Sequence, residues 1–153
     1  MPVREGLARL EGVESVSERC NRHAGTGELR LRNGRLVDPE TLAQQIADIR
    51  VGARLRGLEA TIDGHIEKQR GKPVFRVSKS NEILQLSPLT TKVQIDAVKT
   101  KRVQPPTLEE KRAYKALLAK LKAEPSPARI TGPLRHTSSA KPLILEVRAF
   151  ELK

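Results

Sequence analysis

Two short patterns hold the residues best suited to binding a metal ion. Cys20 and His23 form a C-x-x-H pair, and a thiolate beside an imidazole suits zinc or copper. The pair supplies only part of the roughly four ligands that a stable zinc site needs. The remaining ligands would have to come from His65, His136, a carboxylate or another chain. The competing interpretation is a loop thiol next to an exposed imidazole.

The other pattern is the alternating row Asp63, His65 and Glu67. On a β-strand these side chains share one face, because successive side chains point to opposite faces. Two carboxylates beside an imidazole could bind a cation, with His65 among the ligands. A solvated strand face explains the same row. No cofactor therefore follows with certainty, and copper and zinc are the metals to consider.

Nucleophilic catalysis would need a base within reach of Cys20, Ser138 or Ser139. His136 lies close to the two serines in sequence, but no nucleophile-elbow pattern surrounds them. The chain also has no P-loop, no G-x-G-x-x-G and no H-E-x-x-H motif. We therefore predict that this protein is not an enzyme.

Positive charge is concentrated in the second part of the chain. The protein has 29 Lys and Arg against 18 Asp and Glu, a formal net charge of +11, and every lysine lies at position 68 or later. Such a surface attracts polyanions by counterion release, independently of their sequence. A solvated basic face, an acidic protein partner and an anionic lipid surface are the alternatives. The candidate polyanion-binding residues are Lys68, Arg70, Lys72, Arg76, Lys79, Lys99, Lys101 and Arg102.

Aromatic residues, which would provide stacking platforms for bases, make up only 2% of the chain. Stacking is worth about 1–3 kcal/mol per base in proteins that bind single strands. Only Phe75 lies on a predicted strand that could present it to a ligand. Its alternation with Val74 and Arg76 leaves open which face of the strand it occupies.

The residues before the lysine-rich part predict a small unit of helices and strands. Helical spacing over 3–11 is followed by a short strand over 13–19 and, after a polar loop, by a strand over 28–32 in which Leu alternates with Arg. Residues 53–68 predict a long strand bent at its glycines.

The clearest local signal in this part is a helix beginning near Asp38. Asp38 can cap the helix and Pro39 suits its first position. Leu42, Ile46 and Ile49 then recur at helical spacing and form its buried stripe.

The second part predicts mainly strands and one helix. Thr107 and Glu110 form a capping box that begins the helix. The strands are expected over 72–79, 82–88, 92–99, 128–136 and 141–152, and the helix over 107–122. From residue 53 onward this order is similar to that of the five-stranded OB barrel. An open antiparallel sheet carrying one helix is the alternative.

The first part carries a more specific resemblance. The stretches "LARLEGVESVSER" and "GELRLRNGRLVDPETLAQQI" resemble the heavy-metal-associated (HMA) domain over about residues 3–63. That resemblance implies a ferredoxin-like βαββαβ fold and metal binding or delivery. The family's first strand and its C-x-x-C loop would lie just before Met1, so we expect either an upstream segment or a module that serves only as a scaffold.

The sequence thus predicts an α+β protein of two parts. A truncated ferredoxin-like module over 1–63 precedes a small, basic, antiparallel OB-like barrel over 64–153. The first functional hypothesis is a non-enzymatic binding protein that handles a metal, if an upstream C-x-x-C exists, and contacts a protein partner. The second is a basic nucleic-acid-binding or structural protein.

The sequence contains no clear targeting signal or membrane-spanning segment. No apolar run approaches the ~20 residues of a membrane span, and the first residues lack the apolar stretch of a signal peptide. As the sequence stands this favours the cytoplasm, whereas a start further upstream would leave the cell envelope open.

Overall fold

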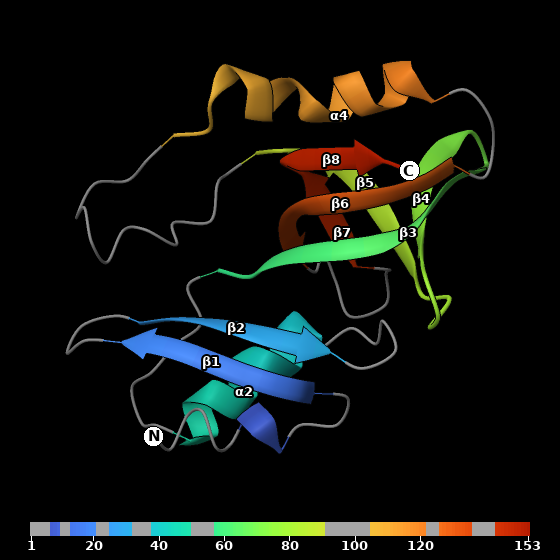
Figure 1. Ribbon diagram of the computed structural model, residues 1–153. Coiled ribbons are helices and arrows are strands. Elements are labelled where there is room, and N and C mark those ends of the chain that lie inside the picture. Colours follow the sequence, from blue (N-terminus) through green and yellow to red (C-terminus); the bar gives the residue numbers. More distant parts are fainter. Residues whose placement is uncertain are drawn as a thin grey trace.

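The computed structural model describes residues 7–9, 13–20, 25–31, 38–49, 57–90, 105–121, 126–135 and 143–153. Within them the chain is mostly β-structure (Figure 1). The elements are β1 (Val13–Cys20), β2 (Gly25–Leu31), α2 (Pro39–Ile49), β3 (Glu59–Gln69), β4 (Lys72–Val77), β5 (Ile83–Pro88), α4 (Leu108–Lys120), β6 (Ser126–Arg135), β7 (Ile144–Val147) and β8 (Ala149–Leu152).

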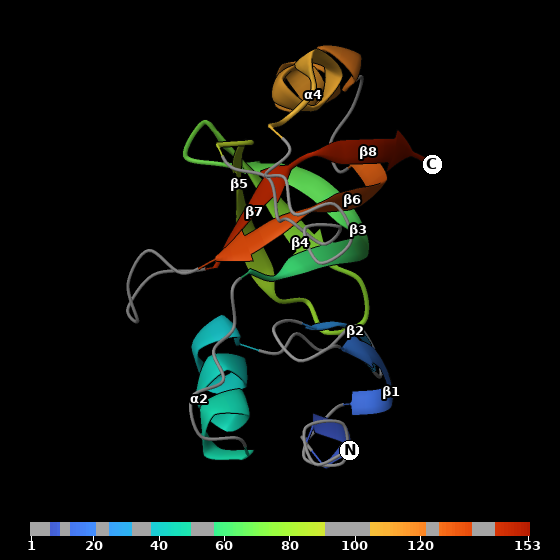
Figure 2. The same cartoon turned by 90° about the vertical axis from the view of Figure 1, so that its left-hand side faces the viewer.

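The first elements form a hairpin backed by a helix. Strands β1 and β2 pair antiparallel, from Val13 opposite Leu31 to Cys20 opposite Gly25. Helix α2 lies beside this hairpin (Figure 2). Its Leu42 is buried in a small cluster with Leu7 and Val13. The predicted strands and the helix that begins after Asp38 are therefore confirmed, while no described strand pairs with the hairpin to complete a ferredoxin-like sheet.

The remaining strands close into a five-stranded barrel. Neighbouring strands follow the order β3-β4-β5-β7-β6, and β6 pairs back onto β3 to complete the ring. All of these pairs are antiparallel except β5–β7, which is parallel. The prediction of an all-antiparallel barrel is therefore wrong for one pair of strands. The chain passes through α4 and β6 between β5 and β7, and this crossover allows the two strands to run parallel. The short β8 follows β7 after Arg148 and pairs with β6.

The barrel interior is aliphatic, with one aromatic ring at its centre. Phe75 is fully buried, so it points inward and is not a stacking platform on the surface. Inward residues alternate with outward ones along β3, as a half-buried strand requires. Helix α4 packs on β5, β7 and β8 and contributes Ala113 and Leu117 to the core. The core comprises Ile62, Ile66, Phe75, Val77, Leu84, Leu86, Ala113, Leu117, Ala128, Ile130, Leu134, Leu145 and Val147.

The predicted second part agrees with the structure in most places. Helix α4 begins after Thr107, whose hydroxyl accepts a hydrogen bond from the backbone of Glu110, and the predicted capping box is confirmed. Strand β3 begins at Glu59 and pairs with β6 from its first residue, so a division between 63 and 64 would fall inside one strand. The strand expected over 92–99 lies outside the described residues. Neither described helix is long and apolar enough to cross a membrane.

Two glycines mark places where strands approach closely. A Cβ added at Gly64 would overlap the carbonyl oxygen of Arg76 on β4. A Cβ added at Gly132 would overlap the carbonyl oxygen of Glu146 on β7. Each opposing atom belongs to the backbone and cannot rotate away. The glycines therefore allow β3 and β6 to bend against their neighbours at the barrel seams.

We expect Gly132→Ala to destabilise the barrel by about 1–3 kcal/mol or more, because the added methyl group has to displace the backbone of β7. Chemical denaturation followed by circular dichroism measures the effect. Gly71→Asn is the matched control. Gly71 has a φ of 80° with nothing within 4 Å of its added Cβ, and asparagine tolerates that backbone region. Equal stability of the Gly132→Ala variant and the natural protein would contradict the explanation that β6 and β7 approach too closely at Gly132 for a side chain.

Candidate nucleic-acid interface

Three of the predicted basic residues gather at the turn between β3 and β4. Gln69 pairs with Lys72, so Arg70 and Gly71 form a two-residue turn. Their φ angles are 52° and 80°, which is the combination that a tight type I′ hairpin turn requires. Lys68, Arg70 and Lys72 are all exposed there. We call these three residues the hairpin tip.

Lys79 does not join the hairpin tip. It lies in the turn between β4 and β5, where its φ is 72°, at the opposite end of β4. A strand rises about 3.3 Å per residue, so the two turns are roughly 20 Å apart. Figure 1 shows them at opposite ends of β4. The structure therefore separates Lys79 from Lys68, Arg70 and Lys72.

Arg76 faces outward on β4 but is engaged by a carboxylate. Its Nε lies 2.9 Å from Glu67 Oε1, and a second guanidinium nitrogen lies 3.2 Å from Oε2. The hydrogen bond from Arg76 lowers the pKa of Glu67, and the same bond raises the pKa of Arg76. A phosphate would have to compete with this bidentate pair, so Arg76 adds little net charge to the surface.

The row around His65 is also divided among ion pairs. Asp63 accepts two hydrogen bonds from Arg129, at 2.8 and 3.2 Å, and Lys153 Nζ lies 3.3 Å away. The bond from Arg129 is the main reason that the pKa of Asp63 is lowered. With both flanking carboxylates bound by arginines, His65 keeps no free acidic partner on its strand face. Among the described residues, no three His, Cys, Asp or Glu side chains are grouped to hold a metal.

Several predicted site residues lie wholly or partly outside the described part of the chain. Cys20 is the last residue of β1 and pairs with Gly25, but its side chain lies outside the described part. His23 lies outside it altogether, and so do Lys99, Lys101 and Arg102.

A basic surface that the sequence analysis missed lies on α4. Lys111, Arg112 and Lys115 are exposed on the side of the helix opposite the buried Ala113 and Leu117. Their spacing of i, i+1 and i+4 was the available signal, since such residues share one helix face. We call these three residues the α4 stripe.

An ion pair holds α4 against the barrel. The Arg148 guanidinium donates to both carboxylate oxygens of Glu59, at 2.9 and 2.5 Å, and to Glu110 at 3.4 Å. The bonds to Glu59 are the main cause of the raised pKa of Arg148. Because Glu110 belongs to the first turn of α4 and Glu59 begins β3, this contact sets where the helix lies on the barrel.

A buried carboxylate anchors the end of β5. Glu146 is only 1% exposed. One of its oxygens accepts from the backbone NH and the hydroxyl of Thr90, at 2.6 and 2.9 Å. The other accepts from Arg135 Nε at 2.5 Å. A buried charge is stable only when it is paired in this way, so Glu146 has a structural role and neutralises Arg135.

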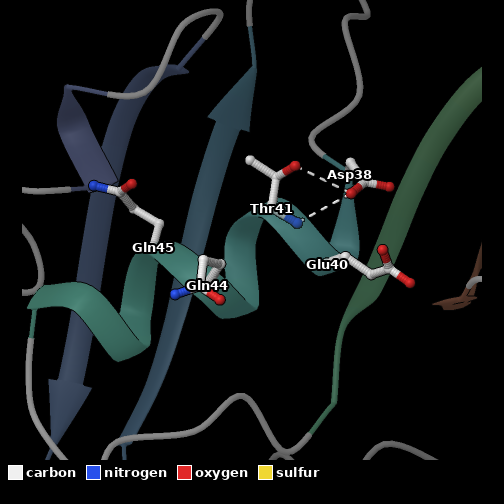
Figure 3. Close-up of a pocket in the computed structure, with 5 residues that line it drawn as sticks. All are labelled: Asp38, Glu40, Thr41, Gln44 and Gln45. Atoms are coloured by element: carbon white, nitrogen blue, oxygen red, sulfur yellow. Dashed lines mark hydrogen bonds between the residues drawn. The ribbon is translucent and has the colours of Figure 1, made fainter. Parts of the chain in front are cut away.

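The surface depression shown in Figure 3 has the opposite character. It lies on α2 and is lined by Asp38, Glu40, Thr41, Gln44 and Gln45. One Asp38 oxygen accepts hydrogen bonds from the backbone NH and the hydroxyl of Thr41, at 3.0 and 3.1 Å. Asp38 is therefore the helix cap. An acidic and amide lining does not suit a polyanion.

Comparison of the chain with protein-family models, with curated proteins and with solved structures finds no match. What the protein binds therefore has to be inferred from the geometry and charge of its own residues.

We expect the barrel to lose stability in acid. The folded state lowers the pKa of Asp63 and of Glu67 below their ordinary values of 3.8 and 4.5. Their stabilisation is therefore complete above those ordinary values and is lost as the pH falls through the lowered ones, where both groups become protonated. Because both ion pairs are partly exposed to solvent, the effect is modest.

The double variant Asp63→Asn, Glu67→Gln tests this dependence. In urea denaturation it should be less stable than the natural protein at pH 7, and the difference should shrink near pH 2.5. Glu14→Gln, an exposed carboxylate on β1, is the control. A stability difference that is the same at both pH values would show that these ion pairs do not cause the acid sensitivity.

Proposed function

We propose that this protein is a non-enzymatic binding protein whose barrel has an OB-like fold and binds single-stranded nucleic acid through phosphate contacts. The strand order, the β3–β6 closure, the parallel β5–β7 pair and the helix between β5 and β6 support the OB-like assignment. Proteins of that fold bind oligonucleotides at the second and third strands and at the loop between the first two. Here that loop is the β3–β4 turn.

The single observation that carries the proposal is the hairpin tip. Three exposed cations, Lys68, Arg70 and Lys72, lie within five residues at a tight two-residue turn and the strand ends beside it. Clustered cations displace the counterions condensed on a nucleic acid, and this release drives binding that depends on salt but not on base sequence. The whole-chain charge of +11 favours encounter with such a partner.

The positions of the aromatic side chains support phosphate contacts as the mode of binding. Phe75 is fully buried in the barrel. Tyr114 and Phe150, the other two aromatic residues of the chain, pack against the same core. With one ring fully buried and the other two partly buried, little aromatic surface is left for stacking, so base identity has little influence. We expect an affinity in the range typical of non-specific binding, about 10⁻⁴–10⁻⁶ M at physiological salt.

Fluorescence anisotropy with a labelled oligo(dT) at several salt concentrations tests this function. The double variant Arg70→Asn, Lys72→Gln should bind more weakly, and its logarithmic salt slope should fall by about 1.4, because a single strand contributes about 0.7 per phosphate contact. Asparagine accommodates the positive φ of residue 70. Arg9→Gln, Arg30→Gln removes the same charge from exposed positions outside the barrel and is the control. Equal losses in both variants, or no binding by the natural protein, would refute the proposal.

A second candidate function is metal handling by an HMA-like module over residues 1–63. Its support is the antiparallel β1–β2 hairpin with α2 packed on it through Leu42, which is compatible with part of a ferredoxin-like unit. Titration with Zn²⁺ or Cu⁺ should then give binding that is lost in both Cys20→Ser and His23→Ala. Unchanged metal affinity in both variants would exclude these residues as ligands.

A further inference from the structure

We propose that the α4 stripe is a second phosphate-binding surface, so that one single-stranded nucleic acid contacts the hairpin tip and then runs along the outer face of α4. This inference rests on the proposed function and goes beyond it. It moves part of the ligand path away from the outer face of β4 and β5 and onto the helix, and it predicts a minimum ligand length.

The exposure pattern of α4 turns the stripe toward solvent. Ala113 and Leu117 are buried against the barrel, whereas Lys111, Arg112 and Lys115 are exposed. Leu108, which lies one turn before Lys111 on the same face, is 62% exposed. A helix rises 1.5 Å per residue, so Lys111 and Lys115 are about 6 Å apart along its axis. Three cations are thus presented in one short row.

The neighbouring carboxylates leave the charge of this row largely uncompensated. Glu110 is directed to the barrel side, where it accepts from the backbone NH of Thr107 and from Arg148. Glu109 is the one exposed carboxylate of the helix. Within the described part of the chain, the stripe residues form no ion pair, in contrast to Arg76 on the outer face of β4.

The helix that carries the stripe packs on the same barrel that carries the hairpin tip. Ile66, near the end of β3, pairs with Ser126, the first residue of β6. Since α4 ends only a few residues before Ser126, the C-terminal end of the helix and the β3–β4 turn lie on the same side of the barrel (Figure 1). Exposed Lys120, in the last turn of α4, is directed toward the barrel, where its Nζ lies 5.6 Å from the centre of the Phe150 ring.

The chemistry favours a nucleic acid over the other anionic partners of a basic helix. An amphipathic helix that binds a membrane surface presents a broad apolar face, whereas α4 exposes only Leu108 beside its cations. An acidic polypeptide remains a competing occupant. Poly-glutamate, an acidic chain without bases or phosphates, therefore serves as a second ligand in the test.

The experiment compares a short oligo(dT) of about 4 nucleotides with one of about 16, the span of site sizes seen for one OB fold. The triple variant Lys111→Gln, Arg112→Gln, Lys115→Gln removes the stripe, and glutamine has nearly the helix propensity of lysine and arginine. Lys111→Arg, Lys115→Arg keeps the charge and is the matched control. Circular dichroism confirms that each variant is folded.

We expect the triple variant to bind the long strand at least several-fold more weakly, with a salt slope lower by about 2, while its affinity for the short strand is unchanged. The arginine control should bind both strands as the natural protein does. If the triple variant binds the long strand normally while Arg70→Asn, Lys72→Gln does not, the inference is overturned and the proposed function stands. If the natural protein binds neither strand, the proposed function fails and this inference fails with it. Loss of poly-glutamate binding alone would assign the stripe to an acidic partner and overturn the inference.

Discussion

The pairing of β3 with β6 is the interaction on which the rest of this structure depends. It joins residues about seventy positions apart, from Glu59 opposite Pro133 to Ile66 opposite Ser126. It turns a sheet into a closed barrel and pairs the edge of β3 that an open sheet would leave exposed. It also places the end of β3 beside the strand that follows α4. The hairpin tip and the C-terminal end of α4 therefore lie on one side of the barrel (Figure 1).

Closure requires a backbone without side chains at two points. Gly64 and Gly132 lie where β3 and β6 bend against β4 and β7, and a methyl group at either would strike a carbonyl oxygen. The same alternation that directs Ile62 and Ile66 inward directs Asp63 and Glu67 outward. The alternation of side chains along the strand therefore determines both which residues form the core and which charged residues face the surface.

Charged residues of the barrel form ion pairs with one another. Four arginines of the barrel are held by carboxylates, in the pairs Arg76–Glu67, Arg129–Asp63, Arg135–Glu146 and Arg148–Glu59. The planar guanidinium suits such contacts because it can donate to both oxygens of a carboxylate. Within the described residues, Lys68, Arg70 and Lys72 around the β3–β4 turn and Lys111, Arg112 and Lys115 on α4 are exposed. The hairpin tip and the α4 stripe are therefore two places where positive charge of the described residues reaches the surface.

Local signals in the sequence were sufficient for most elements and for one half of the candidate site. The Thr107–Glu110 capping box begins α4 as predicted, and the alternation of apolar and polar residues marks β5. The exposure of Lys68, Arg70 and Lys72 follows from the turn between β3 and β4. The spacing of Lys111, Arg112 and Lys115 could have predicted the basic face of α4. The helix was instead interpreted from its apolar residues, which gave the stronger signal.

What the sequence alone determined is the order of the elements, the caps and turns, and the position of the positive charge along the chain, because each depends on residues a few positions apart. What only the tertiary structure decided is the inward position of Phe75, the parallel β5–β7 pair and the pairing of Arg76 with Glu67 and of Arg129 with Asp63. These depend on which strands become neighbours after closure. Strand register is set by the burial of a whole face, and no local spacing specifies the partner across the barrel.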